Sequence, residues 1–154
     1  GADPLITTRA VDQQTQAMQD AGVARLRVLV ADDNRDSAET LALLLELRGF
    51  DVTTASDGEA AVRTFETLRP EVVLLDLGMP RLSGHDACRA IRAMPQGEST
   101  FIIAVTGWGQ ARDRERSQAA GFDVHLVKPV DHDTLSRLLT QHALRLPPRE
   151  LPNM

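Results

Sequence analysis

The chain has 154 residues, 42% of them hydrophobic, and its 17 Lys and Arg against 22 Asp and Glu give a net charge of −5. That length fits one domain, and with four Phe, one Trp and no Tyr the core must be mainly aliphatic. An acidic chain lacks the basic face that supplies most affinity for nucleic acid, and its apolar runs are far below the roughly 18 residues that cross a bilayer. The single cysteine, Cys88, excludes an internal disulfide and is typical of a reducing compartment. We therefore expect a cytoplasmic protein that contacts neither nucleic acid nor membrane.

The two ends of the chain differ from its middle. Residues 1–24 are rich in Gln and Thr and contain no aromatic side chain, and their apolar residues recur at a loose helical spacing. They are interpreted as a linker or as a flanking helix, which either joins the domain to a preceding segment or packs on it. Residues 147–154 begin with two prolines and are predicted to be a C-terminal tail. The predicted domain covers residues 25–146.

Within this domain, short apolar runs alternate with amphipathic stretches. Continuous, largely β-branched runs are typical of strands covered on both faces, and they predict strands over 28–31, 52–55, 72–75, 101–105 and 124–127. The intervening patterns predict helices over 37–48, from the Ser56 cap to Pro70, over 84–94 and 110–120, and after Asp131. Five strands alternating with five helices indicate an α/β fold with a five-stranded parallel sheet and helices on both faces.

Local signals predict where the helices begin and end. Gly49 is expected at the position that terminates the first helix in the left-handed conformation. Ser56 and Glu59 have the spacing of a capping box, which would make Ser56 the N-cap of the second helix. Cys88 is predicted to be a small core residue, and three helical histidines are predicted to be solvated: His85, His132 and His142.

Chemically useful side chains follow four of the five predicted strands. Asp32 and Asp33 follow the first strand, Asp76 the third, Thr106 the fourth and Lys128 the fifth. In open parallel sheets, ligands bind beyond the carboxyl ends of the strands. Each of these residues alone has an ordinary structural explanation, such as a helix N-cap or a surface charge. Together they predict a site at one edge of the sheet.

The chemistry of that predicted site follows from its charges. Clustered carboxylates repel one another and raise one another's pKa unless a cation lies among them. Oxygen ligands with open positions are what Mg²⁺ accepts in proteins. A carboxylate is also a competent nucleophile toward phosphorus, and a metal ion and a lysine would neutralise the phosphoryl oxygens. The sequence therefore predicts a Mg²⁺ site that forms an aspartyl phosphate.

Four segments carry a family resemblance: residues 28–34 (VLVADDN), 73–80 (VLLDLGMP) with Gly84, 104–107 (AVTG) and 127–129 (VKP). In this order and spacing they resemble the receiver domain of two-component response regulators, over residues 27–145. The stretch from Thr106 to Asp131 is most similar to receivers attached to hybrid sensor histidine kinases. The resemblance implies a flavodoxin-like fold and a phosphoaccepting signalling switch, which catalyses only its own phosphorylation and dephosphorylation.

The resemblance also implies a role for each site residue. Asp76 matches the phosphoacceptor and also faces the metal. Asp33 matches the direct Mg²⁺ ligand, and Asp32 the acidic residue that reaches the metal through water. The backbone carbonyl of Gly78 matches the third protein ligand. Thr106 and Lys128 match the hydroxyl and the ammonium that contact the phosphoryl group.

One position departs from the family pattern. His125 stands at the switch position, where the family commonly has Tyr or Phe. Its imidazole either takes over the movement of the usual aromatic ring or is that of an ordinary half-buried strand histidine. The resemblance also implies a cis peptide between Lys128 and Pro129. Trp108 follows Thr106 by two residues and is expected either to shield the site from water or to pack on the neighbouring helix.

The implied partners are a histidine kinase or a histidine phosphotransfer domain. A homodimer is expected through the face made by the fourth helix, the fifth strand and the fifth helix. Two other functions fit the pattern less well. A phosphatase with an aspartyl-phosphate intermediate typically carries Asp-x-Asp on its first strand, whereas here Asp32 and Asp33 are adjacent and Asp76 lies on the third strand. A degenerate docking module would have lost site residues that this chain retains.

Overall fold

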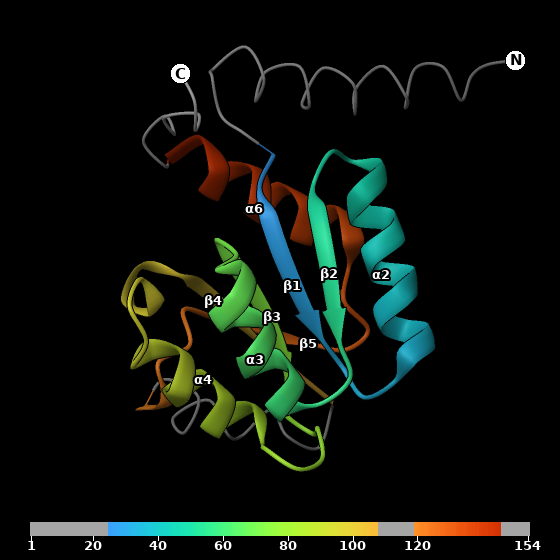
Figure 1. Ribbon diagram of the computed structural model, residues 1–154. Helices are drawn as coiled ribbons and strands as arrows, with labels where there is room; N and C mark the ends of the chain where they lie inside the picture. The colour runs from blue at the N-terminus through green and yellow to red at the C-terminus, as the bar shows by residue number, and fades with distance from the viewer. Residues whose placement is uncertain (1–24, 108–118, 146–154) are drawn as a thin grey trace, which may run out of the picture.

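A five-stranded parallel sheet forms the centre of the computed structural model, which describes residues 25–107 and 119–145 (Figure 1). The strands are β1 (Arg27–Ala31), β2 (Asp51–Ala55), β3 (Val72–Asp76), β4 (Phe101–Thr106) and β5 (Val124–Val127). They lie in the order β2-β1-β3-β4-β5, so that β1 and β3 meet at the point where the direction of chain progression reverses. The predicted α/β fold class is confirmed, with each strand end within one residue of its prediction.

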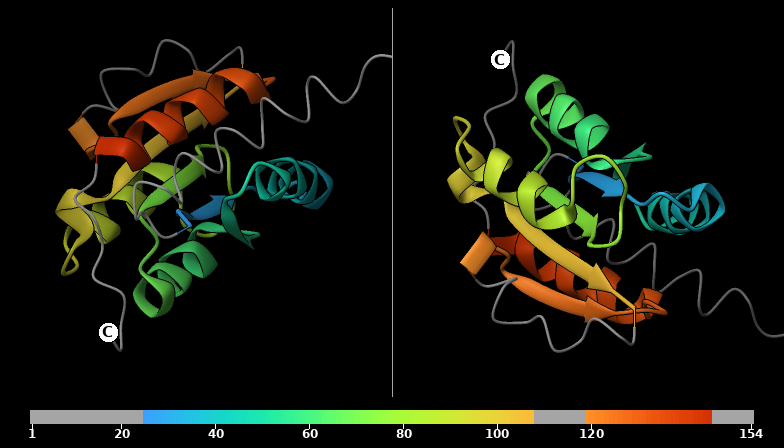
Figure 2. Two further views of the ribbon diagram at one scale, coloured as in Figure 1. Left: turned by 90° about the horizontal axis from the view of Figure 1, so that it is seen from above. Right: turned by 90° about the horizontal axis from the view of Figure 1, so that it is seen from below.

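The helices cover both faces of the sheet, as the two views of Figure 2 show. The described helices are α2 (Arg35–Leu47), α3 (Gly58–Leu68), α4 (Gly84–Arg92) and α6 (His132–Arg145), with a short 3₁₀ turn, η1 (Gly97–Ser99). Alternate strand residues point to opposite faces. One side of β1 and β3 therefore packs on α3 and α4, and the other side packs on α2 and α6. The predicted helix over 110–120 lies almost wholly outside the described residues, and residues 1–24 and the predicted tail, 147–154, lie wholly outside them.

The structure confirms one predicted helix end and contradicts another. Gly49 has a φ of 98° directly after α2, which confirms its predicted role as a helix terminator. The predicted capping box is wrong. The carboxylate of Asp57, not the hydroxyl of Ser56, accepts a hydrogen bond from the Ala60 backbone N–H at 2.8 Å. Because α3 begins at Gly58, Glu59 falls one position too early to close the box.

Two of the three histidines predicted to be solvated are packed against aromatic rings. His85 is only 8% exposed and meets Phe122 edge-on at 6.0 Å between ring centroids. His142 is half-buried and stacks on Phe101 at 4.6 Å, and burial lowers its pKa. The prediction fails because both histidines lie on the buried sides of their helices. Cys88 is fully buried, as predicted, and burial raises the pKa of its thiol to about 11.

Arg92, at the end of α4, ties together the segments that enter β4 and β5. Its guanidinium donates to the carbonyls of Gly97, Thr100 and Gly121 at 2.6 to 2.9 Å. It also forms a 2.8 Å ion pair with Asp123, whose carboxylate accepts a further hydrogen bond from the Ile102 backbone N–H. The side chain of Arg92 is 19% exposed, so these bonds are largely shielded from water.

We expect Arg92→Met to lower the free energy of unfolding by about 2–4 kcal/mol, because it leaves several backbone carbonyls and a carboxylate without their donor. Arg89→Met is the matched control. Arg89 forms an exposed ion pair with Asp86 on the same helix, and loss of this pair should lower the free energy of unfolding by less than about 0.5 kcal/mol. Urea denaturation of both variants measures the difference, and equal losses would contradict the role of Arg92.

Candidate functional site

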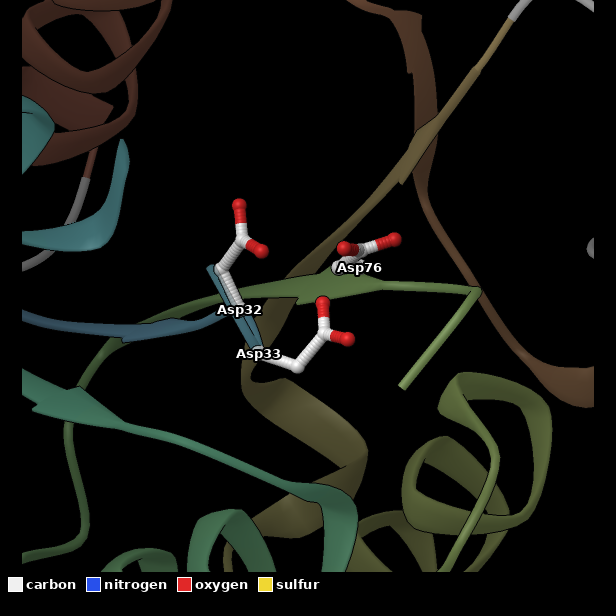
Figure 3. A group of neighbouring side chains, drawn as sticks. All are labelled: Asp32, Asp33 and Asp76. Atoms are coloured by element: carbon white, nitrogen blue, oxygen red, sulfur yellow. The ribbon is translucent and has the colours of Figure 1, made fainter. Parts of the chain in front are cut away.

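The carboxylates predicted to meet do so because β1 and β3 are neighbours in register. Ala31 pairs with Leu75, so Asp32 and Asp76 follow paired residues at the same edge of the sheet. One oxygen of each of Asp32, Asp33 and Asp76 lies within 4.8 Å of the others (Figure 3). The parallel pairing therefore brings three carboxylates together, as the sequence predicts.

The surroundings of these carboxylates differ. Asp76 is 6% exposed and Asp32 is 9% exposed, whereas Asp33 is open to solvent. Burial raises the pKa of Asp32 and the neighbouring Asp76 raises it further, which together outweigh the backbone N–H of Asn34 and the charge of Lys128. The raised pKa of Asp32 therefore reflects first its poor access to water and only then the negative charge of Asp76.

Lys128 supplies one positive charge to the cluster. Its Nζ lies 2.9 Å from Asp76 Oδ2 and 3.4 Å from Asp32 Oδ2. Burial lowers the pKa of this ammonium, but the contacts with Asp76 and Asp32 outweigh burial and hold the pKa above its usual range. The Lys128–Pro129 peptide is cis, as predicted, and the Lys128 backbone N–H donates to the Thr106 carbonyl at 2.6 Å.

The two oxygens of Asp76 have different partners. Oδ2 faces Lys128, and Oδ1 accepts a hydrogen bond from the backbone N–H of Gly78 at 2.9 Å. Gly78 is exposed at the start of the connection between β3 and α4, within reach of the cluster. The Asp76 carboxylate is thus held by a contact on each of its two oxygens.

Thr106 and His125 are joined by a hydrogen bond that the sequence did not predict. Thr106 is fully buried at the end of β4, and its Oγ1 lies 2.9 Å from His125 Nε2 on β5. Ala104 pairs with His125, and Thr106 pairs with Val127, so the two side chains are diagonal neighbours on one face of the sheet. Only the register between the strands could have revealed this contact. Trp108 lies outside the described residues.

A cavity of about 640 Å³ opens beside the cluster on the α2 and α6 face of the sheet. Its floor is the apolar surface of three neighbouring strands, Val30, Leu74 and Val105, and its rim includes Asp76 and Lys128. Sequence reasoning did not find this cavity, because it depends on how far α2 lies from the segment that enters α6. It gives Asp76 an open approach from that face.

Comparisons with known proteins agree with this geometry. The family model of the response regulator receiver domain matches residues 28–140. The transcriptional regulatory protein PrrA of Mycobacterium leprae is 39% identical over 71% of this chain, and the sensor kinase/phosphatase CqsS of Vibrio cholerae is 34% identical over the same share. This chain spans 46% of PrrA and 16% of CqsS.

One solved structure matches this chain over nearly the whole length of the solved protein. The receiver domain of the sensor histidine kinase PA1611 from Pseudomonas aeruginosa matches with a TM-score of 0.71 and 34% identity, over 78% of this chain and 98% of that one. That structure has a magnesium ion coordinated in its active-site cleft.

The chain therefore belongs to the response regulator receiver family. It is a phosphoaccepting switch of two-component signalling, with the flavodoxin-like fold that the resemblance implied. Nothing in the sheet, the cluster or the comparisons favours the phosphatase alternative. No helix within residues 25–107 and 119–145 is long and apolar enough to cross a membrane.

We expect Asp33→Asn to raise the free energy of unfolding of the metal-free protein by about 0.5 kcal/mol, since it relieves repulsion between neighbouring charges. Within the described residues, Lys128 pairs with Asp32 and Asp76 but not with Asp33. Thermal unfolding in EDTA measures the effect. Glu39→Gln, on an exposed turn of α2, is the control, and a destabilised Asp33→Asn would contradict the repulsion.

Proposed function

We propose that Asp76 accepts a phosphoryl group from the phosphohistidine of a histidine kinase or a histidine phosphotransfer domain, with Mg²⁺ bound beside it. The observation that carries the proposal is the position of Asp76, which lies between two further carboxylates and the Lys128 ammonium. Family membership supports the same reaction and a cytoplasmic location. It also supports a signalling role without turnover of an external substrate.

The residues present fit a divalent cation. Three carboxylates and one ammonium leave a formal charge of −2 when all are ionised, and carboxylate and carbonyl oxygens are the ligands that Mg²⁺ prefers. Asp33 and Asp76 would bind the ion directly, Asp32 through water, and Gly78 through its carbonyl. When bound, Mg²⁺ would neutralise charge on the phosphoryl oxygens. PA1611 supports this assignment, because its cleft holds magnesium.

The chain's own residues would supply the remaining steps. A carboxylate oxygen of Asp76 attacks phosphorus, the bond from phosphorus to the donor imidazole breaks, and the imidazole leaves neutral after taking up a proton. Lys128 then exchanges its contact with Asp76 Oδ2 for a phosphoryl oxygen, and the Thr106 hydroxyl donates to another. Most of the catalysis is positioning, which the paired contacts of Asp76 provide.

The hydrogen bond between Thr106 and His125 links this chemistry to β5. Thr106 can turn toward a phosphoryl oxygen only by giving up its 2.9 Å contact with His125, so phosphorylation changes the surroundings of the imidazole. That differential contact is what a shift between two conformations requires. We propose that the shift reaches β5 and α6, and that the surface of these two elements binds a partner or a second copy.

Phosphorylation at Asp76 is tested by incubating the protein with Mg²⁺ and phosphoramidate, followed by intact-protein mass spectrometry. We expect the wild type to gain one phosphoryl group and Asp76→Asn to gain none. Asp86→Asn, an exposed carboxylate on α4, is the matched control and should be labelled like the wild type. Unchanged labelling of Asp76→Asn would refute the assignment.

The switch is tested with His125→Phe, which removes the 2.9 Å contact between the Thr106 hydroxyl and the imidazole but keeps a ring. A neutral hydrogen bond is worth about 1 kcal/mol, so this variant should bind the phosphoryl analogue beryllofluoride about fivefold more tightly than the wild type. Thr106→Val should bind it more weakly, because it lacks the hydroxyl. Titrations followed by calorimetry compare the three proteins, and equal affinities of His125→Phe and the wild type would show that the bond does not oppose the switch.

A further inference from the structure

The connection between β3 and α4, residues 77–83, carries the proposed carbonyl ligand Gly78 and is anchored from inside the fold. The side chains of Leu77 and Met79 are 7% and 6% exposed and pack with α3 and α4. The Leu77 backbone N–H donates to the Val105 carbonyl at 3.0 Å. At the far end, a Cβ on Gly84 would lie 2.8 Å from the Asp76 carbonyl oxygen, so α4 begins directly beneath the site. These contacts hold both ends of the connection.

The part of the connection that precedes α4 is held from the other side by the first residue of α3. A Cβ on Gly58 would lie 1.9 Å from the Leu82 carbonyl oxygen and 2.8 Å from Leu82 Cβ, far inside van der Waals contact. Gly58 is buried in a helix and is not among the residues with a positive φ, so its backbone suits alanine and only the close approach requires glycine. Beside it, Asp57 lies 3.7 Å from the Arg81 guanidinium. The start of α3 therefore rests directly on the backbone of this connection.

We propose that Gly58 is a positioning residue for the metal site. By allowing α3 to contact the Leu82 backbone, it sets the path of residues 77–83 and thereby the place of the Gly78 carbonyl relative to Asp33 and Asp76. The inference rests on the proposed function, because it assigns Gly58 to the same Mg²⁺ site. Gly58 itself touches neither the metal nor the phosphoryl group. It acts only through Leu82 and the connection that Leu82 belongs to.

Gly97 provides a control that separates the proposed role of Gly58 from the effect of close packing alone. A Cβ on Gly97 would lie 1.7 Å from the Ile91 carbonyl oxygen, a clash as severe as the one at Gly58. Gly97 lies in η1, which leads into the amino end of β4, whereas the carboxylates lie at the carboxyl ends of β1 and β3. Gly97→Ala therefore disturbs packing without reaching the site.

The experiment compares Mg²⁺ binding by calorimetry and Mn²⁺ binding by electron paramagnetic resonance in the full chain. We expect Gly58→Ala to weaken binding of both metal ions about tenfold, as is usual when a group that orients a ligand is disturbed. Gly97→Ala should lose comparable stability in urea and keep the wild-type affinity. Equal affinities of Gly58→Ala and Gly97→Ala would overturn the proposal.

Leu82→Ala is a milder change that tests the same proposal if the Gly58→Ala protein does not fold. The variant keeps the backbone and Cβ that approach Gly58 but removes the rest of the half-buried side chain, which packs with α3 and α4 and helps to hold the connection in place. We expect it to weaken metal binding about threefold. Leu138→Ala, equally half-buried on α6, is its control and should bind like the wild type. If Leu82→Ala and Leu138→Ala bind metal equally well, the connection does not depend on α3 and the proposal fails.

Asp33→Asn distinguishes this failure from failure of the proposed function. If the wild type binds Mg²⁺ and Asp33→Asn does not, the metal site is correctly assigned, and the glycine variants then decide the role of Gly58. If Asp33→Asn binds metal as tightly as the wild type, the assignment of the metal site is wrong, and the proposed role of Gly58 is then wrong as well.

Discussion

The structure depends on one electrostatic constraint: three carboxylates are held together at the ends of two neighbouring strands. The parallel register of β1 and β3 leaves Asp32 and Asp76 no means of moving apart, because each follows a strand whose backbone bonds are fixed on both sides. Like charges at this separation would repel strongly in a poorly solvated site. Lys128 offsets one of the three charges, while burial and then the charge of Asp76 raise the pKa of Asp32. The fully ionised cluster keeps an excess of negative charge, which a divalent cation would neutralise.

The same constraint connects the site to the rest of the sheet. Asp76 is bonded to Lys128, which follows β5, and Lys128 donates through its backbone to the Thr106 carbonyl at the end of β4. Thr106 in turn contacts His125 through its hydroxyl. Asp76 is therefore connected through Lys128 to the end of β5 and, by the Lys128 backbone, to Thr106 and its contact with His125. These bonds join the carboxylate cluster to the edge strand of the sheet.

The fold and the site differ in how well sequence predicts them. β1 and β3 are continuous runs of largely buried aliphatic residues, so their positions can be predicted from the sequence, and the residues after parallel strands share one edge. Helix ends are harder to predict, since Ser and Asp are both common N-cap residues and here Ser56 and Asp57 are adjacent, yet only Asp57 caps α3. The burial of His85 depends on the rotation of α4, and the bond between Thr106 and His125 depends on register. Both are properties of packing between elements.

The two faces of the sheet serve the site differently. On the α3 and α4 face, Gly58 and Gly84 let helices approach so closely that a single methyl group would displace the backbone. On the α2 and α6 face, a cavity of about 640 Å³ separates the helices beside Asp76 and Lys128. Interiors at close-packed density deform little, so the α3 and α4 side fixes the segment that follows Asp76. The cavity leaves open space on the other side of the same aspartate, beside Lys128. A site with this asymmetry can hold its carboxylates in place and still admit a reactant, as a phosphoaccepting switch requires.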